Sequence, residues 1–400
     1  MQKDLCQAFI NYLLSNFLVL INAWYSKKIV TGGEYHMLNV LKNWSLKHRI
    51  SLFLPKLAYQ TTKEMLPKVN LIYFTSNEND EEIKSLFKLS LTYFVRIVRS
   101  IFIHPKDYPD IIITASHFLY DVLPAVVLRR RHKSKLVIYS HGILRHYRSY
   151  NQGLRSNLML LTERISLFLC RRSADAIFAI NSETKGFLVL RGFDPNKITI
   201  IRNGLDHEFI ATIKGNIEEY EASFCGRLVK RKGVYDLLDI WEEVLKHLPL
   251  SRLIIIGQGQ EFDGLKEAIR KKGLHKYIVL PGYVSEAEKI SLFKSSKIFI
   301  FPSIEEAWGI AITEAMACRL PVVCYDLPAY NFVEKGIVKL DIGNKELMAR
   351  SIVELLSNDI RRAELSKEAL QESKKFDWNS ISEQELTRVS MLLNKTNFTP

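Results

Sequence analysis

Short apolar runs alternate with longer amphipathic stretches along most of the chain. In the second half, an apolar run at 298–301 is followed by Pro302, a turn, a helix-forming run at 310–318 and a second apolar run at 322–325. A buried strand, a helix and another buried strand form a βαβ unit. Sheets built from such units bind ligands at the carboxyl ends of their strands, so this stretch predicts a site as well as a fold element.

The same alternation predicts two α/β domains. Further strand-length apolar runs occupy 17–23, 50–54, 71–74, 110–114, 135–139, 176–180 and 198–201, and then 222–225, 253–256 and 278–280. Helical patterns are found at 35–44 and 82–102. Residues 207–221 are polar and contain glycine, which marks a linker between a first domain at 1–206 and a second at 222–378.

Composition fits this picture. Four hundred residues with 47% hydrophobic and 25% charged side chains are typical of a globular protein of two domains. The net charge of +13 is concentrated in the first half, in basic clusters at 129–133 and 145–148. Such an excess favours phosphate-bearing partners (nucleotides, nucleic acid or anionic lipid), and a solvated basic face is the alternative. Five cysteines without a Cys-x-x-Cys pair indicate a reduced, cytosolic protein.

Two stretches raise the question of membrane contact. Residues 5–26 contain no charged side chain, but polar residues such as Gln7 and Asn11 interrupt them. We predict a short apolar helix followed by the first strand, with a membrane-contacting N-terminal helix as the alternative. The helix predicted at 82–102 is basic and amphipathic, which suits either an anionic membrane or packing on a sheet.

Several glycines and cations lie where a phosphate could bind. Gly226 and Arg227 follow a predicted strand, and Lys232 lies in the same turn, so backbone and cations could cradle a diphosphate. Gly32 and Gly33 form a turn before a helix, where bare N–H groups could hold a second part of it.

The stretch at 298–325 resembles the Glu-x7-Glu signature of the retaining GT-B glycosyltransferases of family 4. It reads Glu306-Ala-Trp-Gly309-Ile310, then Glu314-Ala-Met-Ala, then Pro-Val-Val at 321–323. Gly-Arg-Leu…Lys-Gly at 226–233 and Gly-Gly-Glu-Tyr-His at 32–36 resemble the same family. Two departures are Arg319 in place of the frequent Gly, and Tyr-Asp-Leu-Pro at 325–328 in place of Gly-Gly-Pro.

The resemblance implies a GT-B fold, in which two Rossmann-like domains with parallel sheets face each other across a cleft and residues 379–400 pack back on the first domain. It implies that Glu314 binds the ribose hydroxyls of a nucleotide-sugar donor and Glu306 its sugar, while His141 contacts sugar or phosphate. The other donor contacts that it implies are Asn203, Gly257, Val284, Gly309 and Ile310.

The predicted chemistry needs no metal and no cofactor beyond the donor itself. A diphosphate is a good leaving group once its charge is neutralised, and the chain has no Asp-x-Asp pair that would hold Mg²⁺ for this purpose. Arg227, Lys232 and the N–H groups near Gly33 and Gly309 can neutralise it directly. Retention at the anomeric carbon is implied by the family alone.

We therefore predict a retaining, metal-independent glycosyltransferase that transfers sugar to a glycan or lipid-linked acceptor, in the cytoplasm or at the inner face of the membrane. A GT-B-shaped epimerase or phosphorylase is one alternative. A non-enzymatic basic protein that binds nucleic acid or membrane is another, but it leaves two carboxylates beside a phosphate cradle unexplained. Nucleic acid is accordingly not an expected partner.

Overall fold

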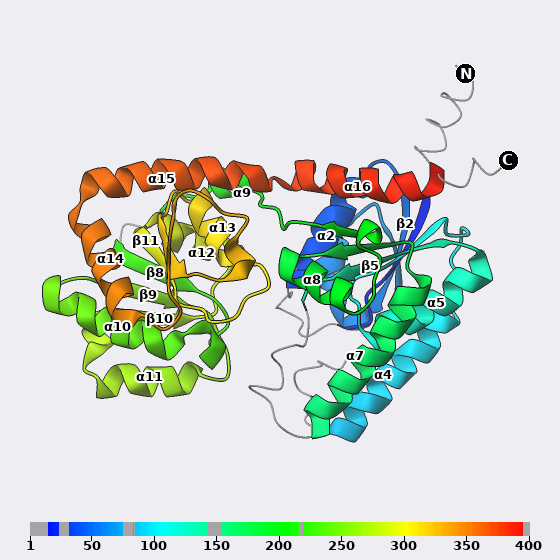
Figure 1. Ribbon diagram of the computed structural model, residues 1–400, viewed down its shortest axis with the longest axis horizontal. Coiled ribbons are helices and arrows are strands. Elements are labelled where there is room, and N and C mark those ends of the chain that lie inside the picture. Colours follow the sequence, from blue (N-terminus) through cyan, green and yellow to red (C-terminus); the bar gives the residue numbers. More distant parts are fainter. Residues whose placement is uncertain are drawn as a thin grey trace, which may run out of the picture. The chain divides into compact units, whose positions relative to one another are not determined.

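The computed structural model describes residues 15–23, 32–74, 83, 85–142, 154–215 and 219–394. The chain divides into unit 1, made of Met1–Asn203 and Trp378–Pro400, and unit 2, made of Gly204–Asp377 (Figure 1). The apolar helix predicted at 5–16 and the basic cluster at 145–148 lie almost entirely outside the described residues.

Unit 1 is built on a parallel sheet of seven strands in the order β3-β2-β1-β4-β5-β6-β7. Its core strands are apolar at nearly every position because helices cover both faces of a parallel sheet. The strands are β1 (Asn16–Leu20), β2 (Arg49–Pro55), β3 (Asn70–Phe74), β4 (Ile111–Thr114), β5 (Lys135–Ser140), β6 (Ala176–Ala179) and β7 (Ile198–Ile200).

The helices of unit 1 are divided between the two faces of this sheet. Right-handed crossovers place the helices that lead from β1 toward β3 on one face and those that lead from β3 toward β7 on the other. The first group is α2 (Gly32–Trp44) and α3 (Tyr59–Met65), with the C-terminal α16 (Trp378–Asn394) packed on α2. The second group is α4 (Leu86–Ile101), α5 (Leu119–His132), α7 (Leu154–Ser173) and α8 (Ser182–Leu190), with α4 and α7 both packed on α5.

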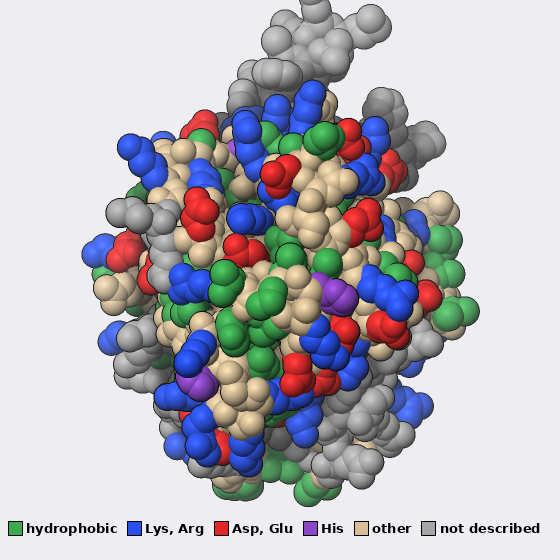
Figure 2. Space-filling model, turned by 90° about the vertical axis from the view of Figure 1, so that its left-hand side faces the viewer, with side chains coloured by type: hydrophobic (Ala, Val, Ile, Leu, Met, Phe, Trp, Pro, Cys, Tyr) green, Lys and Arg blue, Asp and Glu red, His purple; other side chains and the backbone are tan. Residues whose placement is uncertain are grey.

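Unit 2 repeats the arrangement with six parallel strands in the order β10-β9-β8-β11-β12-β13. The strands are β8 (Tyr220–Cys225), β9 (Leu253–Ile256), β10 (Ile278–Gly282), β11 (Ser296–Phe301), β12 (Val322–Tyr325) and β13 (Ile337–Leu340). The helices are α9 (His207–Thr212), α10 (Val234–His247), α11 (Phe262–Lys271), α12 (Glu286–Lys294), α13 (Ile310–Ala317), α14 (Lys345–Ser357) and α15 (Asp359–Ser373). Figure 2 shows that acidic and basic side chains are interspersed over one face of this unit.

Two Rossmann-like α/β units therefore confirm the predicted fold class, while some boundaries differ. The segment 207–221 belongs to unit 2 and contains α9 and the start of β8. Gly32 and Gly33, predicted as a turn, are the first residues of α2. Strand β13 was not predicted from the sequence. No helix within the described ranges combines the length and hydropathy needed to cross a membrane.

Candidate active site

Two glycine turns at the carboxyl ends of β8 and β9 lie in direct backbone contact. The amide of Gly226 donates to the carbonyl of Ile256 at 3.0 Å, and that of Gly257 donates to the carbonyl of Gly282 at 2.9 Å. Gly257 has a φ of +142°, and a Cβ placed there would lie 1.9 Å from the carbonyl oxygen of Gly226. Only glycine fits at 257, so this edge of the sheet is a tightly closed backbone surface.

Lys232 and Glu306 form an ion pair that links the two sequence motifs of unit 2. Lys232 lies in a short 3-10 turn after β8, with its ammonium 5.5 Å from the centre of the Phe301 ring at the end of β11. Burial lowers the pKa of Lys232, Glu306 opposes this, and nearby Arg231 and Arg227 lower it further. A cation and a carboxylate are thus held together where a charged ligand would have to separate them.

The helix that carries Glu314 begins directly beside this pair. Helix α13 starts after Gly309, which has a φ of +83° and provides no side-chain cap, so the first N–H groups of the helix have no such partner. A Cβ on Gly309 would lie 2.9 Å from the ring of Tyr330. The Tyr330 hydroxyl and the Trp308 indole N–H are buried and make no hydrogen bond within the described part of the chain. Burial, and after it the charge of Glu306, raises the pKa of the Tyr330 hydroxyl, so this donor lies near Glu306 and has no acceptor among the described residues.

Glu314 has a cationic partner that we did not predict from the sequence. Lys289 on α12 donates to a Glu314 oxygen at 2.9 Å and to Glu286 at 2.7 Å. Burial raises the pKa of Glu314, and Lys289 lowers it. The pKa of Lys289 is raised despite its burial, because Glu314 and Glu286 together outweigh the cost of desolvation. Val284, which we predicted as a donor contact, is half-buried just before α12. Lys289 follows it by five residues, and this spacing was the signal in the sequence that could have indicated the partner of Glu314.

Both ion pairs lie near one strand end. Burial raises the pKa of the Cys225 thiol, the last residue of β8, to about 12, and Lys289, Glu314 and Lys232 all act on it electrostatically. The structure thus brings together most of the residues predicted for unit 2. Those brought together are Gly226, Arg227, Lys232, Gly257, Glu306, Gly309, Ile310 and Glu314. Arg227 is exposed at this edge.

The predicted residues of unit 1 meet at the carboxyl end of its sheet. A Cβ on Gly33 would lie 3.0 Å from the His141 ring, so the start of α2 touches the residue that follows β5. The His141 and His36 ring centres are 5.1 Å apart. Asn203 is buried, and its Oδ1 is 2.8 Å from Nδ1 of His36. Asn203, predicted as a donor contact, therefore has a partner inside the unit.

A buried glutamate from the C-terminal helix completes this cluster. The Glu385 carboxylate lies 3.0 Å from Nε2 of His36 and accepts a hydrogen bond from the Tyr139 hydroxyl at 2.7 Å. Burial lowers the pKa of His141 well below its ordinary value, and the neighbouring His36 and His117 add to this. His141 is thus a neutral imidazole at pH 7, and its buried Nε2 makes no hydrogen bond to the residues described.

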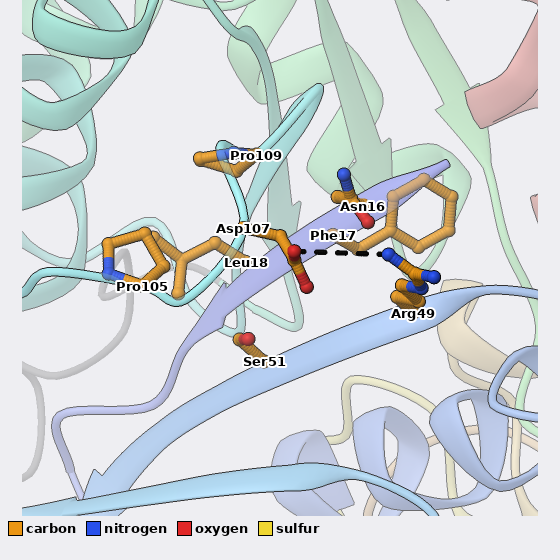
Figure 3. A pocket seen from close by; sticks show the side chains of 8 residues that line it. All are labelled: Asn16, Phe17, Leu18, Arg49, Ser51, Pro105, Asp107 and Pro109. Atoms are coloured by element: carbon orange, nitrogen blue, oxygen red, sulfur yellow. Dashed lines mark ion pairs between the residues drawn. The ribbon is translucent and has the colours of Figure 1, made fainter. Parts of the chain in front are cut away.

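The cavity drawn in Figure 3 lies at the other end of the unit 1 sheet. It is a small hollow of about 190 Å³, a volume that includes open solvent, and its lining includes Asn16 and Phe17 at the start of β1 and Arg49 at the start of β2. Arg49 and Asp107 face each other across it at 3.8 Å. Since ligands of such sheets bind at the carboxyl ends of the strands, we do not assign this cavity to the site.

Across the described ranges, no group of three or more His, Cys, Asp or Glu side chains is arranged to hold a metal ion. The polar groups of the site are instead cations, helix N–H groups and single carboxylates.

Comparison with known proteins identifies the family. Residues 30–209 match the model described as "Glycosyltransferase Family 4", and residues 208–372 match "Glycosyl transferases group 1". The two matches meet at the boundary between the units and together cover most of the chain. Two Rossmann-like units, the second of which carries the carboxylate pair and the glycine-rich cradle, define a GT-B protein. The chain belongs to the group 1 glycosyltransferases, with a family 4 first domain.

Curated relatives of the chain are similar over part of its length. Alpha-monoglucosyldiacylglycerol synthase of Acholeplasma laidlawii is 31% identical over 38% of this chain and 38% of its own. GDP-mannose:cellobiosyl-diphosphopolyprenol alpha-mannosyltransferase of Xanthomonas campestris is 26% identical over 53% and 54%. Phosphatidyl-myo-inositol mannosyltransferase of Mycobacterium leprae is 32% identical over 40% and 44%. The matches thus span about half the length of these relatives or less.

Solved structures share the fold over nearly the whole chain. Anabaena HepE, solved in complex with UDP and glucose, superimposes with a TM-score of 0.72 at 19% identity and covers 94% of this chain and 100% of its own. Sucrose-phosphate synthase from Thermosynechococcus elongatus gives 0.76 at 15% identity over 95% and 100%.

Proposed function

We propose that this chain transfers a sugar from a nucleotide-sugar donor to a lipid-linked glycan or lipid acceptor, with retention at the anomeric carbon and without a metal ion. The observation that carries the proposal is the pairing of each carboxylate of the Glu-x7-Glu motif with a largely buried lysine, at and within the first turns of a helix whose N-terminus has no side-chain cap. Such an arrangement can bind a nucleoside diphosphate and its sugar side by side.

Each part of the donor has a matching group. The diphosphate carries negative charge that grows as the anomeric bond breaks, and Arg227, Lys232 and the first N–H groups of α13 are the cations and dipoles available to it. Lys232 would exchange Glu306 for the diphosphate, which frees Glu306 to accept hydrogen bonds from the sugar. Glu314, held by Lys289, would accept hydrogen bonds from the ribose. Complexes of the structural neighbour HepE with UDP and UDP-glucose support a nucleotide-sugar donor.

Neutral His141 in unit 1 suits a hydrogen bond to an uncharged hydroxyl. The names of three relatives contain a monoglucosyldiacylglycerol, a cellobiosyl-diphosphopolyprenol and a phosphatidyl-myo-inositol. They support a lipid or lipid-linked acceptor for this chain as well, and with it a location at the cytoplasmic face of a membrane.

The test is a panel of UDP-, GDP- and ADP-linked sugars, assayed for nucleotide release with and without a chelator. We expect turnover of at least one donor, at a rate that the chelator does not change. The anomeric configurations of donor and product, compared by NMR, should be the same, which would show retention. Lys232→Ala and Glu306→Gln should each lower kcat by about 100-fold or more. Lys272→Ala is the matched control, because Lys272 pairs with Asp239 and Glu242 on α10.

Loss of turnover on chelation would exclude the metal-independent mechanism. Equal activity of Lys232→Ala and the control would exclude the assigned site, and interconversion of two nucleotide sugars without transfer would indicate the epimerase.

A further inference from the structure

Two neighbouring helices of unit 1 expose apolar side chains along their whole length. On α4, Phe87 is 79% exposed, Phe94 63% and Phe102, just after the helix, 66%, with Leu91 between them. These positions recur every three or four residues or in multiples of that interval, so they lie along one stripe of the helix. A helix that only packs on its sheet would turn this stripe inward.

Helix α7 carries a second stripe of the same kind. Leu154, Leu161, Ile165 and Phe168 are all exposed and follow the same helical spacing. The guanidinium of Arg172 lies 4.5 Å from the centre of the Phe168 ring, so a cation and an aromatic side chain are presented together.

The two stripes lie on helices of the same side of the sheet. Both helices pack on α5, and α5 has no exposed residue between Leu119 and Arg129. Helices α4 and α7 therefore cover α5 and form the outer layer on this side of the sheet (Figure 1). We call the stripes together the α4/α7 face, made up of Phe87, Leu91, Phe94, Phe102, Leu154, Leu161, Ile165 and Phe168.

The charge on these helices has one sign. Helix α4 contains no Asp or Glu, and the single acid of α7, Glu163, is buried against His117 at 3.0 Å. Among the side chains that the structure describes on the two helices, the exposed charged ones are Lys88, Arg99, Arg164, Arg171 and Arg172. By contrast, the face of unit 2 in Figure 2 mixes both signs. Two helices whose described exposed charges are all cationic, and which also expose apolar stripes, match an anionic bilayer, which offers hydrocarbon beneath a layer of negative headgroups.

We propose that the α4/α7 face docks the protein on an anionic lipid surface, with its phenylalanine and leucine side chains inserted at the level of the headgroups. The arginines and lysines then lie among lipid phosphates. This deepens the proposed function, because a lipid-linked acceptor is confined to such a surface, but the binding itself requires neither donor nor acceptor.

The test is flotation of the full-length chain with vesicles of phosphatidylcholine, and with vesicles of phosphatidylcholine and phosphatidylglycerol at about three to one. We expect flotation with the anionic vesicles only, weakened by salt. Phe87→Ser with Phe94→Ser, and separately Leu161→Ser with Phe168→Ser, should each lower partitioning by about tenfold or more. Arg164→Gln should lower it by roughly fivefold.

Matched controls come from unit 2. Ile360→Ser on α15 removes an apolar side chain that is 77% exposed, and Lys266→Gln on α11 removes an exposed cation. Both should float like the parent chain, and thermal unfolding of every variant should be unchanged, because the substituted side chains are on the surface.

The proposal is wrong if the parent chain does not float with anionic vesicles, or if the α4/α7 variants float as well as the controls. It is also wrong if the parent is a dimer in gel filtration and the same variants are monomers, because the face would then join two copies. Donor turnover by the soluble protein is measured in parallel. Turnover without flotation would contradict only the proposal that the α4/α7 face docks on lipid. Flotation without turnover would contradict only the proposed sugar transfer.

Discussion

Lys289 and Glu314 are a pair in unit 2 whose charges depend on each other. Their side chains are 12% and 10% exposed, so each has lost most of its hydration and is compensated by the other. Because Glu314 is the carboxylate proposed to bind ribose, Lys289 acts on the donor through it, as a positioning residue.

Replacing Lys289 with Met should raise the KM for the donor by roughly tenfold while kcat changes less, because a weakened hydrogen bond to a ground-state group affects binding. Loss of the cation raises the pKa of Glu314, so the acid limb of the KM profile should move to higher pH. Steady-state kinetics across pH measure both, with Lys289→Arg as the variant expected to restore binding.

The control is Lys272→Met, which removes an exposed lysine just after α11 that pairs with Asp239 and Glu242 on α10. A fall in kcat alone, or an unchanged pH profile in Lys289→Met, would contradict the assigned role.

Asp121 is a buried acid of unit 1 whose protonation should affect stability. It accepts a hydrogen bond from the amide of Asn22 at 2.8 Å and another from Ser116. Burial raises its pKa to about 7, although the Ser116 hydroxyl and Asn22 oppose this. The native state therefore binds a proton that the unfolded chain has released, in the window between about pH 4 and pH 7.

Stability from this group is fully present below pH 4 and is lost as pH rises through 7, at no more than about 1.4 kcal/mol per pH unit. Asp121→Asn should remove this dependence, so its melting temperature should fall less than that of the parent between pH 5 and pH 8. Thermal unfolding at several pH values tests this, with exposed Asp107→Asn as control. Parallel curves for parent and Asp121→Asn would show that burial does not control this group.

Among the elements, the glycine turns explain why the strand ends of unit 2 can come together. Gly257 and Gly273 both have positive φ, but only at Gly257 would a Cβ meet backbone, at 1.9 Å from the Gly226 carbonyl; at Gly273 nothing lies within 4 Å. An alanine at Gly273 would therefore meet only backbone strain, whereas an alanine at Gly257 would meet backbone strain and a clash with the Gly226 carbonyl.

Gly273→Ala should cost about 1 kcal/mol, which is the price of a left-handed alanine. Gly257→Ala should cost several kcal/mol more and lower the affinity for nucleotide, because the turns after β8 and β9 must move apart. Thermal unfolding and nucleotide titration of both variants measure the difference. Equal losses would mean that the contact between the turns is not needed.

The elements that sequence reasoning found and missed follow from burial. Strands such as β11 and β12 were predicted because each is a run of apolar residues bounded by Pro or Gly. Strand β13, at the edge of its sheet, is half-buried throughout and contains Lys339, so it has no continuous apolar run. The helix pattern at 82–102 was predicted, but whether its apolar stripe faces the sheet or the solvent could not be read from one helix alone.

For the whole molecule, the return of the chain to unit 1 matters most. Helix α16 follows unit 2 in sequence, yet the indole of Trp44 on α2 donates to the carbonyl of Ser382 at 2.8 Å, and Glu385 enters the cluster around His36. Unit 1 is therefore complete only after unit 2 has been synthesised.

Glu385→Ala should destabilise unit 1 by roughly 3 kcal/mol, because the His36 imidazole and the Tyr139 hydroxyl lose a buried partner. Glu383→Ala is the matched control on the same helix, since its pairing with Lys47 is half-exposed and contributes little. Hydrogen exchange resolved by segment should show faster exchange in unit 1 only for Glu385→Ala. Equal effects of the two substitutions would argue against a buried network.

The sequence by itself determined the two α/β units, most of their strands and the motif positions of Lys232, Glu306 and Glu314. These depend on local periodicity and on spacing within short segments, which a linear chain displays directly. Only the tertiary structure decided that Lys289 pairs with Glu314, that Asn203 and Glu385 hold His36, and that α4 and α7 expose their apolar stripes. Those contacts join residues from separate elements, and burial is a property of the packed chain that no single segment contains.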